Sequence, residues 1–150
     1  MGWSNCATVS ACIGLALDFS SLERAVASLT RAAERSVREP LDEEVRDAVI
    51  LRFACGYELC WKMLKRQLEL KLPNPSDAGR MSFSELMREG AERGLVPNLE
   101  RWMVYRHQRN LTSHVYDETV AQSVHGTALE FLDDARTLLN ALLARQAHGT

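Results

Sequence analysis

Apolar residues recur every three or four positions along most of this chain, which restricts it to a fold built from helices. The clearest example is the segment 120–142, where successive apolar positions are three or four residues apart. Its apolar positions are Val120, Val124, Ala128, Phe131, Ala135, Leu138 and Leu142. No long stretch alternates with the period of two that a half-buried strand requires. The pattern therefore predicts an all-α protein.

Capping and turn residues divide this pattern into five helices. We expect them at about 21–37, 43–72, 83–94, 99–114 and 118–145, with a loop over 72–80. The predicted N-terminal caps are Ser20 with Glu23, Asp42, Ser82 with Glu85, and Asp117. Because the connections are short, neighbouring helices should run antiparallel. The expected architecture is an antiparallel up-and-down bundle.

The second expected helix carries apolar residues on two faces. One face holds Val45, Val49, Phe53, Gly56, Cys60 and Met63, and the other holds Ile50, Ala54, Tyr57, Trp61, Leu64 and Leu68. Such a helix is either central to the bundle or shared with a partner subunit. Gly56 weakens a helix by about 1 kcal/mol relative to alanine. We therefore expect another backbone to approach closely there.

Length and composition indicate one soluble domain. The chain has 150 residues and a net charge of −2, which excludes a protein that coats nucleic acid indiscriminately. Residues 18–147 should form the domain and residues 1–17 a loosely ordered leader. Cys55 and Cys60 lie in an apolar run and are expected as small buried groups, with no zinc-site spacing. No metal, cofactor or membrane span is expected, and the cytoplasm is the default location.

The most informative motif is R-x4-H-x-Y, formed by Arg109, His114 and Tyr116. The surrounding segment 101–116 contains three arginines and two histidines but no acidic residue. A local basic stripe in a slightly acidic chain indicates an anionic ligand. An imidazole moves protons at cellular pH, and a guanidinium matches the oxygens of phosphate. The pair suits metal-independent cleavage of RNA by its own 2′-hydroxyl.

For this chemistry, Arg109 and His114 must face the same phosphate, and their spacing in the sequence makes that difficult on one straight helix. On a straight helix, Arg109 and His114 lie about 140° apart, whereas Arg106, Asn110 and His114 share one face. Either the helix ends or bends near residues 112–113, or a two-fold dimer sets two motifs across one cleft. A plainer alternative is a structural bundle with solvated arginines. That alternative predicts that Arg109 pairs with a local carboxylate and that His114 is buried.

The motif and two other blocks resemble a known family. Segment 109–118 resembles the signature of HEPN-domain proteins that partner minimal nucleotidyltransferases, called nucleotidyltransferase substrate-binding proteins. Segments 46–66 and 83–95 agree with the same family in the same order. The similarity covers about residues 17–144.

The resemblance implies a helical bundle that forms a homodimer and works with a separately encoded minimal nucleotidyltransferase in a toxin-antitoxin-like module. In the toxin branch, Arg109 and His114 would carry metal-independent RNase activity, and Tyr116 would receive AMP from the partner. Arg106, Asn110 and Tyr116 are expected to bind RNA or nucleotide. The alternative is a non-catalytic subunit that presents a nucleotide or acceptor to the partner enzyme.

Overall fold

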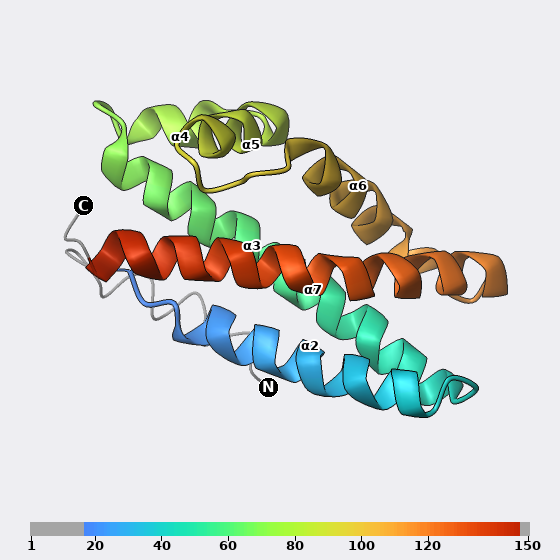
Figure 1. Ribbon diagram of the computed structural model, residues 1–150. Helices are drawn as coiled ribbons and strands as arrows, with labels where there is room; N and C mark the ends of the chain where they lie inside the picture. The colour runs from blue at the N-terminus through green and yellow to red at the C-terminus, as the bar shows by residue number, and fades with distance from the viewer. Residues whose placement is uncertain (1–16, 148–150) are drawn as a thin grey trace.

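The computed structural model describes residues 17–147, and all its regular elements are helical (Figure 1). The α-helices are α2 (Ser20–Arg38), α3 (Glu43–Lys71), α4 (Ser76–Arg80), α5 (Phe83–Glu92), α6 (Leu99–Asn110) and α7 (Glu118–Ala147). A 3₁₀ turn, Leu111–His114, follows α6 directly. The predicted all-α class is confirmed. The predicted leader lies almost wholly outside the described residues.

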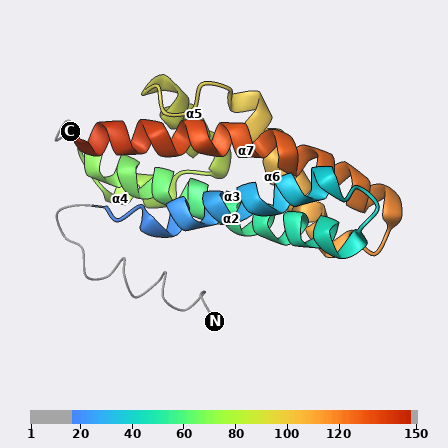
Figure 2. The same ribbon diagram turned by 60° about the horizontal axis from the view of Figure 1, so that its bottom comes forward.

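The helices form an up-and-down bundle whose third segment consists of three shorter helices, α4, α5 and α6. Helix α2 runs antiparallel to α3, and α4, α5 and α6 together return the chain to the end where α3 began (Figures 1 and 2). Helix α7 therefore starts beside the start of α3. The ion pair between Arg46 Nη1 and Glu118 Oε1, 2.7 Å apart, joins these two helix starts.

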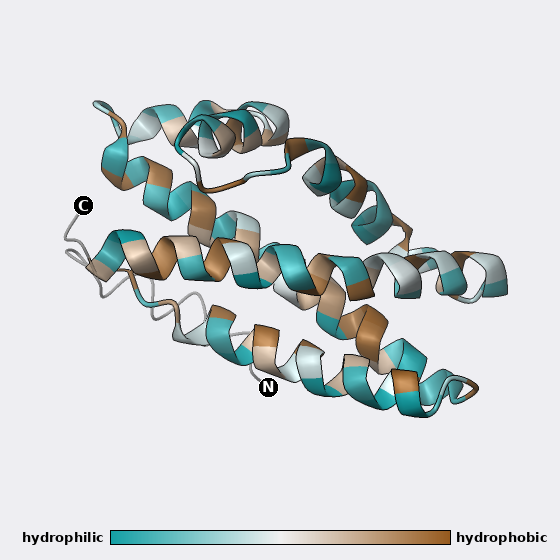
Figure 3. Ribbon diagram, viewed as in Figure 1, coloured by the Kyte–Doolittle hydropathy of each residue, from teal (hydrophilic) through white to brown (hydrophobic). Residues whose placement is uncertain are grey.

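The core lies where α3, α6 and α7 meet, and α2 covers the other side of the α3–α7 pair. Phe131 of α7 is at its centre, with its ring edge-on to the rings of Phe53, Tyr105 and Trp102 at 5.1, 5.1 and 5.7 Å. Apart from the partly exposed Val120, the predicted apolar positions of α7 are all buried. Figure 3 shows the resulting alternation of apolar and polar residues along the long helices. This core fixes α6 against α7.

Three of the four predicted helix caps are confirmed. The Asp42 carboxylate accepts hydrogen bonds from two backbone N–H groups at the start of α3, and Asp117 does the same for α7. Ser82 and Glu85 form the predicted reciprocal capping box at the start of α5. These side chains satisfy backbone donors that have no partner within their own helix.

The capping box predicted at Ser20 and Glu23 is wrong. Helix α2 begins at Ser20 itself, with Phe19 at the capping position and no side-chain cap there. Asp18 Oδ1 accepts a hydrogen bond from the Ser20 backbone N–H at 2.9 Å instead. The carboxylate two residues earlier therefore took the role that the sequence pattern gave to the hydroxyl.

Two other local predictions are corrected. The predicted loop 72–80 contains the short helix α4, which begins where Asn74 Oδ1 accepts hydrogen bonds from the backbone N–H and hydroxyl of Ser76. Among residues 17–147, no backbone of another element approaches Gly56: a Cβ built there would meet the Phe131 ring at 3.4 Å. The small residue accommodates an aromatic side chain. Cys60 is buried as expected, whereas Cys55 is partly exposed.

Candidate functional site in the R-x4-H-x-Y motif

The helical geometry changes in the middle of the motif. Helix α6 ends at Asn110, and the next four residues form a 3₁₀ turn. Thr112 Oγ1 donates a hydrogen bond to the Arg109 carbonyl at 2.7 Å, a side-chain bond that competes with regular helix. The change lies one or two residues before the predicted bend at 112–113. Arg109 therefore lies on an α-helix, whereas His114 ends a tighter turn.

A polar clamp holds α6 against α7 before the motif begins. Arg101 Nε lies 2.8 Å from Asp134 Oδ2 and donates to the Tyr105 hydroxyl at 3.1 Å. The Tyr105 hydroxyl in turn donates to the Asp134 carboxylate. Burial, reinforced by this carboxylate, raises the pKa of Tyr105. The charge of Arg101 is thus used within the fold and does not contribute a free cation to the basic stripe.

Arg109 is held loosely by a carboxylate from another helix. Its Nε lies 3.5 Å from Glu58 Oε1 on α3 but makes no hydrogen bond to it. Its Nη1 donates to Thr112 Oγ1 at 3.2 Å, and 36% of the side chain is exposed. The carboxylate contact is the one that a purely structural bundle predicts. Among the described residues, this Nε is buried and has no hydrogen-bond partner, so its contact with Glu58 is electrostatic only.

Three of the five predicted site residues line one pocket. Arg106, Arg109 and Asn110 line an open pocket of about 320 Å³ between α6, α3 and the α4–α5 segment. The Arg106 guanidinium lies 4.7 Å from the centroid of the Phe83 ring, a cation–π contact from α5. Positive charge is therefore concentrated in a hollow that is large enough for a small ligand.

His114 and Tyr116 lie together but outside this pocket. His114 Nδ1 is 3.5 Å from the Tyr116 hydroxyl, and the two rings meet edge to face. His114 is exposed, and 84% of Tyr116 is exposed. The purely structural reading predicted a buried histidine, which is wrong. Within one protomer, the motif therefore forms two neighbouring groups rather than a single cluster.

Comparison with known proteins agrees with this architecture. Residues 17–144 match the family described as "Nucleotidyltransferase substrate binding protein like". The chain belongs to this family. The resemblance inferred from the three sequence blocks is thereby confirmed.

Two comparisons, both with Haemophilus influenzae sequences, illustrate the relationship. The protein named "Probable ribonuclease HepT" is 34% identical over 134 residues, which span 87% of this chain and 90% of that protein. A solved structure described as the fold of a substrate binding domain of a nucleotidyltransferase superposes with a TM-score of 0.79. It is 30% identical and covers 83% of this chain and 98% of its own.

Sequence reasoning overlooked the α3 side of this family member's pocket. Glu58, Trp61 and Lys65 of α3 line it opposite the motif residues. Their spacing of three and four places them on one face of the helix, which is the signal that was available. Trp61 had been expected in the core, and it is partly buried there while also lining the pocket.

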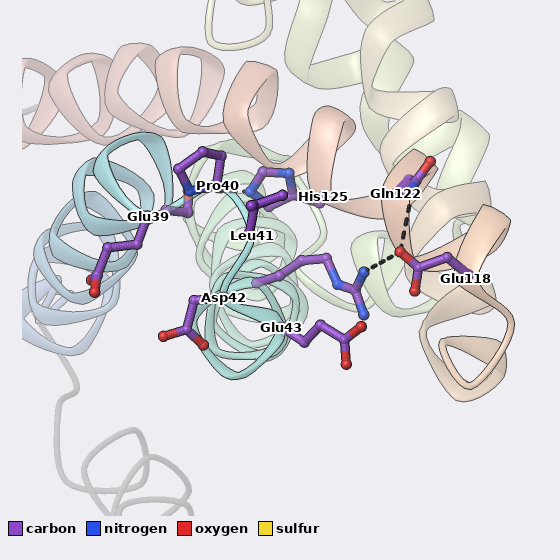
Figure 4. A pocket seen from close by; sticks show the side chains of 10 residues that line it. Glu39, Pro40, Leu41, Asp42, Glu43, Glu118, Gln122 and His125 are labelled. Carbon is purple, nitrogen blue, oxygen red and sulfur yellow. Dashed lines mark hydrogen bonds and ion pairs between the residues drawn. The ribbon is translucent and has the colours of Figure 1, made fainter.

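Figure 4 shows a second pocket, of about 260 Å³, at the end of the bundle where α2, α3 and α7 begin or end. His125 Nε2 lies 3.1 Å from the buried Ser36 hydroxyl, and the Arg46–Glu118 ion pair crosses the pocket. Burial, followed by the charge of Arg46, lowers the pKa of His125. Burial at this end of the bundle therefore disfavours the protonated form of the His125 imidazole.

The lowered pKa of His125 predicts acid-sensitive stability. Folded His125 holds its proton less tightly than unfolded His125, whose ordinary pKa is 6.5. Below that pH the unfolded state binds more protons, so the free energy of unfolding falls as the pH falls. One such group contributes a slope of at most about 1.4 kcal/mol per pH unit. In urea titrations, the free energy of unfolding should fall less between pH 7 and pH 5 for His125→Gln than for wild type. A fall in the free energy of unfolding of His125→Gln that equals or exceeds that of wild type would contradict the prediction.

Two kinds of feature are absent from residues 17–147. No helix in this part of the chain is long and apolar enough to cross a membrane. The same residues contain no group of three or more His, Cys, Asp or Glu side chains placed to hold a metal ion.

Proposed function

We propose that this chain is the HEPN component of a two-component, toxin-antitoxin-like module in the cytoplasm. Its partner is a separately encoded minimal nucleotidyltransferase. The chain binds RNA phosphate in a basic cleft of a homodimer and cleaves the RNA without a metal ion. The observation that carries this proposal is the arrangement of the motif. Cationic Arg106 and Arg109 line a pocket, and an exposed His114 follows within one 3₁₀ turn.

The dimer brings the two halves of the motif together. Apolar side chains are exposed on both helices that sequence analysis indicated for contact: Leu51 of α3 is 60% exposed and Val104 of α6 is 49% exposed. In the proposed dimer these side chains become buried against a second copy. In the proposed assembly, Arg109 of one protomer and His114 of the other face the same phosphate.

The chemistry follows from these two groups. His114 takes the proton from a ribose 2′-hydroxyl, whose oxygen then attacks the neighbouring phosphorus. The bond from phosphorus to the 5′-oxygen breaks, and the leaving oxygen receives a proton from water. The hydroxide left behind takes the proton that His114 had accepted, which restores the neutral imidazole and the water molecule. Arg109 stabilises the negative charge that develops on the phosphoryl oxygens. The products are a 2′,3′-cyclic phosphate and a 5′-hydroxyl.

Incubation of the purified protein with end-labelled RNA in excess EDTA tests this function. The proposal predicts cleavage products with cyclic-phosphate ends. Intact RNA together with tight binding of a nucleotide would support a second candidate, a non-catalytic subunit that presents substrate to the nucleotidyltransferase. The Glu58–Arg109 ion pair favours this candidate, because it partly neutralises the guanidinium that catalysis requires.

A further inference from the structure

The pocket beside the motif has an aromatic wall that the proposed cleavage chemistry does not use. Tyr57, Trp61 and Phe83 line it from α3 and α5. The Trp61 indole N–H donates a hydrogen bond to Glu58 Oε2 at 3.2 Å, which fixes one edge of the ring. The indole is therefore held in place before any ligand arrives. Immobilised aromatic rings are the surfaces on which unpaired nucleobases stack.

The same pocket contains cations that have no acidic partner. Among residues 17–147, neither Lys65 nor Arg106 has a carboxylate oxygen within 4.0 Å. Both line the pocket, on opposite helices. Arg101, by contrast, is fully engaged by Asp134 and Tyr105. Lys65 and Arg106 are thus available for phosphate oxygens.

We propose that this pocket is a subsite for one unpaired nucleotide of RNA, whose base stacks on Trp61 and whose phosphate contacts Lys65 and Arg106. The inference rests on the proposed function, because Arg109 and Asn110 line the same hollow and place this nucleotide next to the phosphate that reacts. Single-stranded RNA fits better than a duplex, whose bases are already stacked and paired. The subsite therefore restricts cleavage to unpaired regions.

RNA binding is measured on the His114→Ala protein, because this variant should leave the RNA intact. The probe is a fluorescein-labelled single-stranded RNA octanucleotide, and fluorescence anisotropy reports its binding. Trp61→Ala added to this protein should weaken binding about 5- to 150-fold, the loss of one base–aromatic stack. Trp61→Phe keeps an aromatic face and should bind within about threefold of the parent. Thermal melting, monitored by circular dichroism, establishes that each variant is folded.

Two lysines of α3 provide a matched pair for the phosphate contact. Lys65 lines the pocket, whereas the exposed Lys62 does not. Lys65→Ala should weaken binding severalfold and reduce the slope of log K against log salt by about 0.7. Lys62→Ala should change affinity less than twofold. Equal effects of the two substitutions would overturn the assignment of Lys65.

Binding of other ligands shows whether the nucleotide in the pocket belongs to single-stranded RNA or is a free nucleotide. A duplex of the same RNA should bind with an affinity that does not depend on Trp61. If Trp61→Ala weakens binding of AMP or ATP but not of the octanucleotide, the pocket serves a free nucleotide and the RNA subsite is overturned. Wild-type cleavage with an unchanged KM in Trp61→Ala would also overturn the subsite while leaving the RNase intact. RNA binding that depends on Trp61, without any cleavage, would overturn the RNase activity and support the subsite.

Discussion

His114→Ala should reduce the rate of RNA cleavage by about 10²- to 10⁴-fold, the usual contribution of one general acid–base group. The side chain is exposed, and the contact described for it is with Tyr116. Its removal should therefore change the free energy of unfolding by no more than about 0.5 kcal/mol. Single-turnover cleavage of a labelled RNA in EDTA measures the rate, and urea titration measures the stability.

His107→Ala is the matched control. His107 is also exposed and also lies in the basic stripe, on α6, but it is outside the motif. Cleavage by this variant should stay within about twofold of wild type. If His114→Ala cleaves as fast as His107→Ala, then His114 is not the catalytic acid or base.

If the proposed nucleotidyltransferase partner transfers AMP to Tyr116, as the family resemblance implies, Tyr116→Phe should abolish that transfer. The chain has three tyrosines, and Tyr57 and Tyr105 are buried, whereas the Tyr116 hydroxyl is accessible. In the transfer, this hydroxyl oxygen attacks the α-phosphorus of ATP, and pyrophosphate leaves. Phenylalanine lacks the oxygen. Incorporation of label from α-labelled ATP measures the reaction, with a purified minimal nucleotidyltransferase, the proposed partner, as the enzyme.

The position of Tyr116 also suggests how the proposed modification would silence the proposed RNase activity. Its hydroxyl is 3.5 Å from His114 Nδ1, so an attached nucleotide would place bulk and negative charge beside the imidazole. Labelled wild-type protein should therefore lose cleavage activity, while unlabelled Tyr116→Phe should keep it. Tyr57→Phe is the control and should accept label normally. Full labelling of Tyr116→Phe would move the modification to another residue.

Local chemistry explains which parts of the fold were predictable. Asp42, Ser82 and Asp117 cap the helices that they were expected to cap, because each cap depends on neighbours within three residues. The predictions of a plain loop over 72–80 and of a close backbone at Gly56 were wrong. Gly56 depends on Phe131, which is far along the chain, and no local pattern records such a partner.

The candidate site shows the same limit. The sequence pointed to Arg106, Arg109 and Asn110 because they lie in one basic segment, and the structure places them in one pocket. It did not reveal that Glu58 pairs with Arg109 or that Trp61 lines the same pocket. These contacts join α3 to α6 across about fifty residues of chain, so only the packed bundle brings them together.

The central claim is that Arg109 and His114 meet across a two-fold axis. Arg109→Ala and His114→Ala should each be inactive as homodimers. When the two proteins are mixed and their subunits exchange freely, half of the dimers are mixed, and each mixed dimer regains one intact site of two. The account predicts recovery of about a quarter of the wild-type cleavage rate. No recovery, with light scattering showing that mixed dimers have formed, would contradict it.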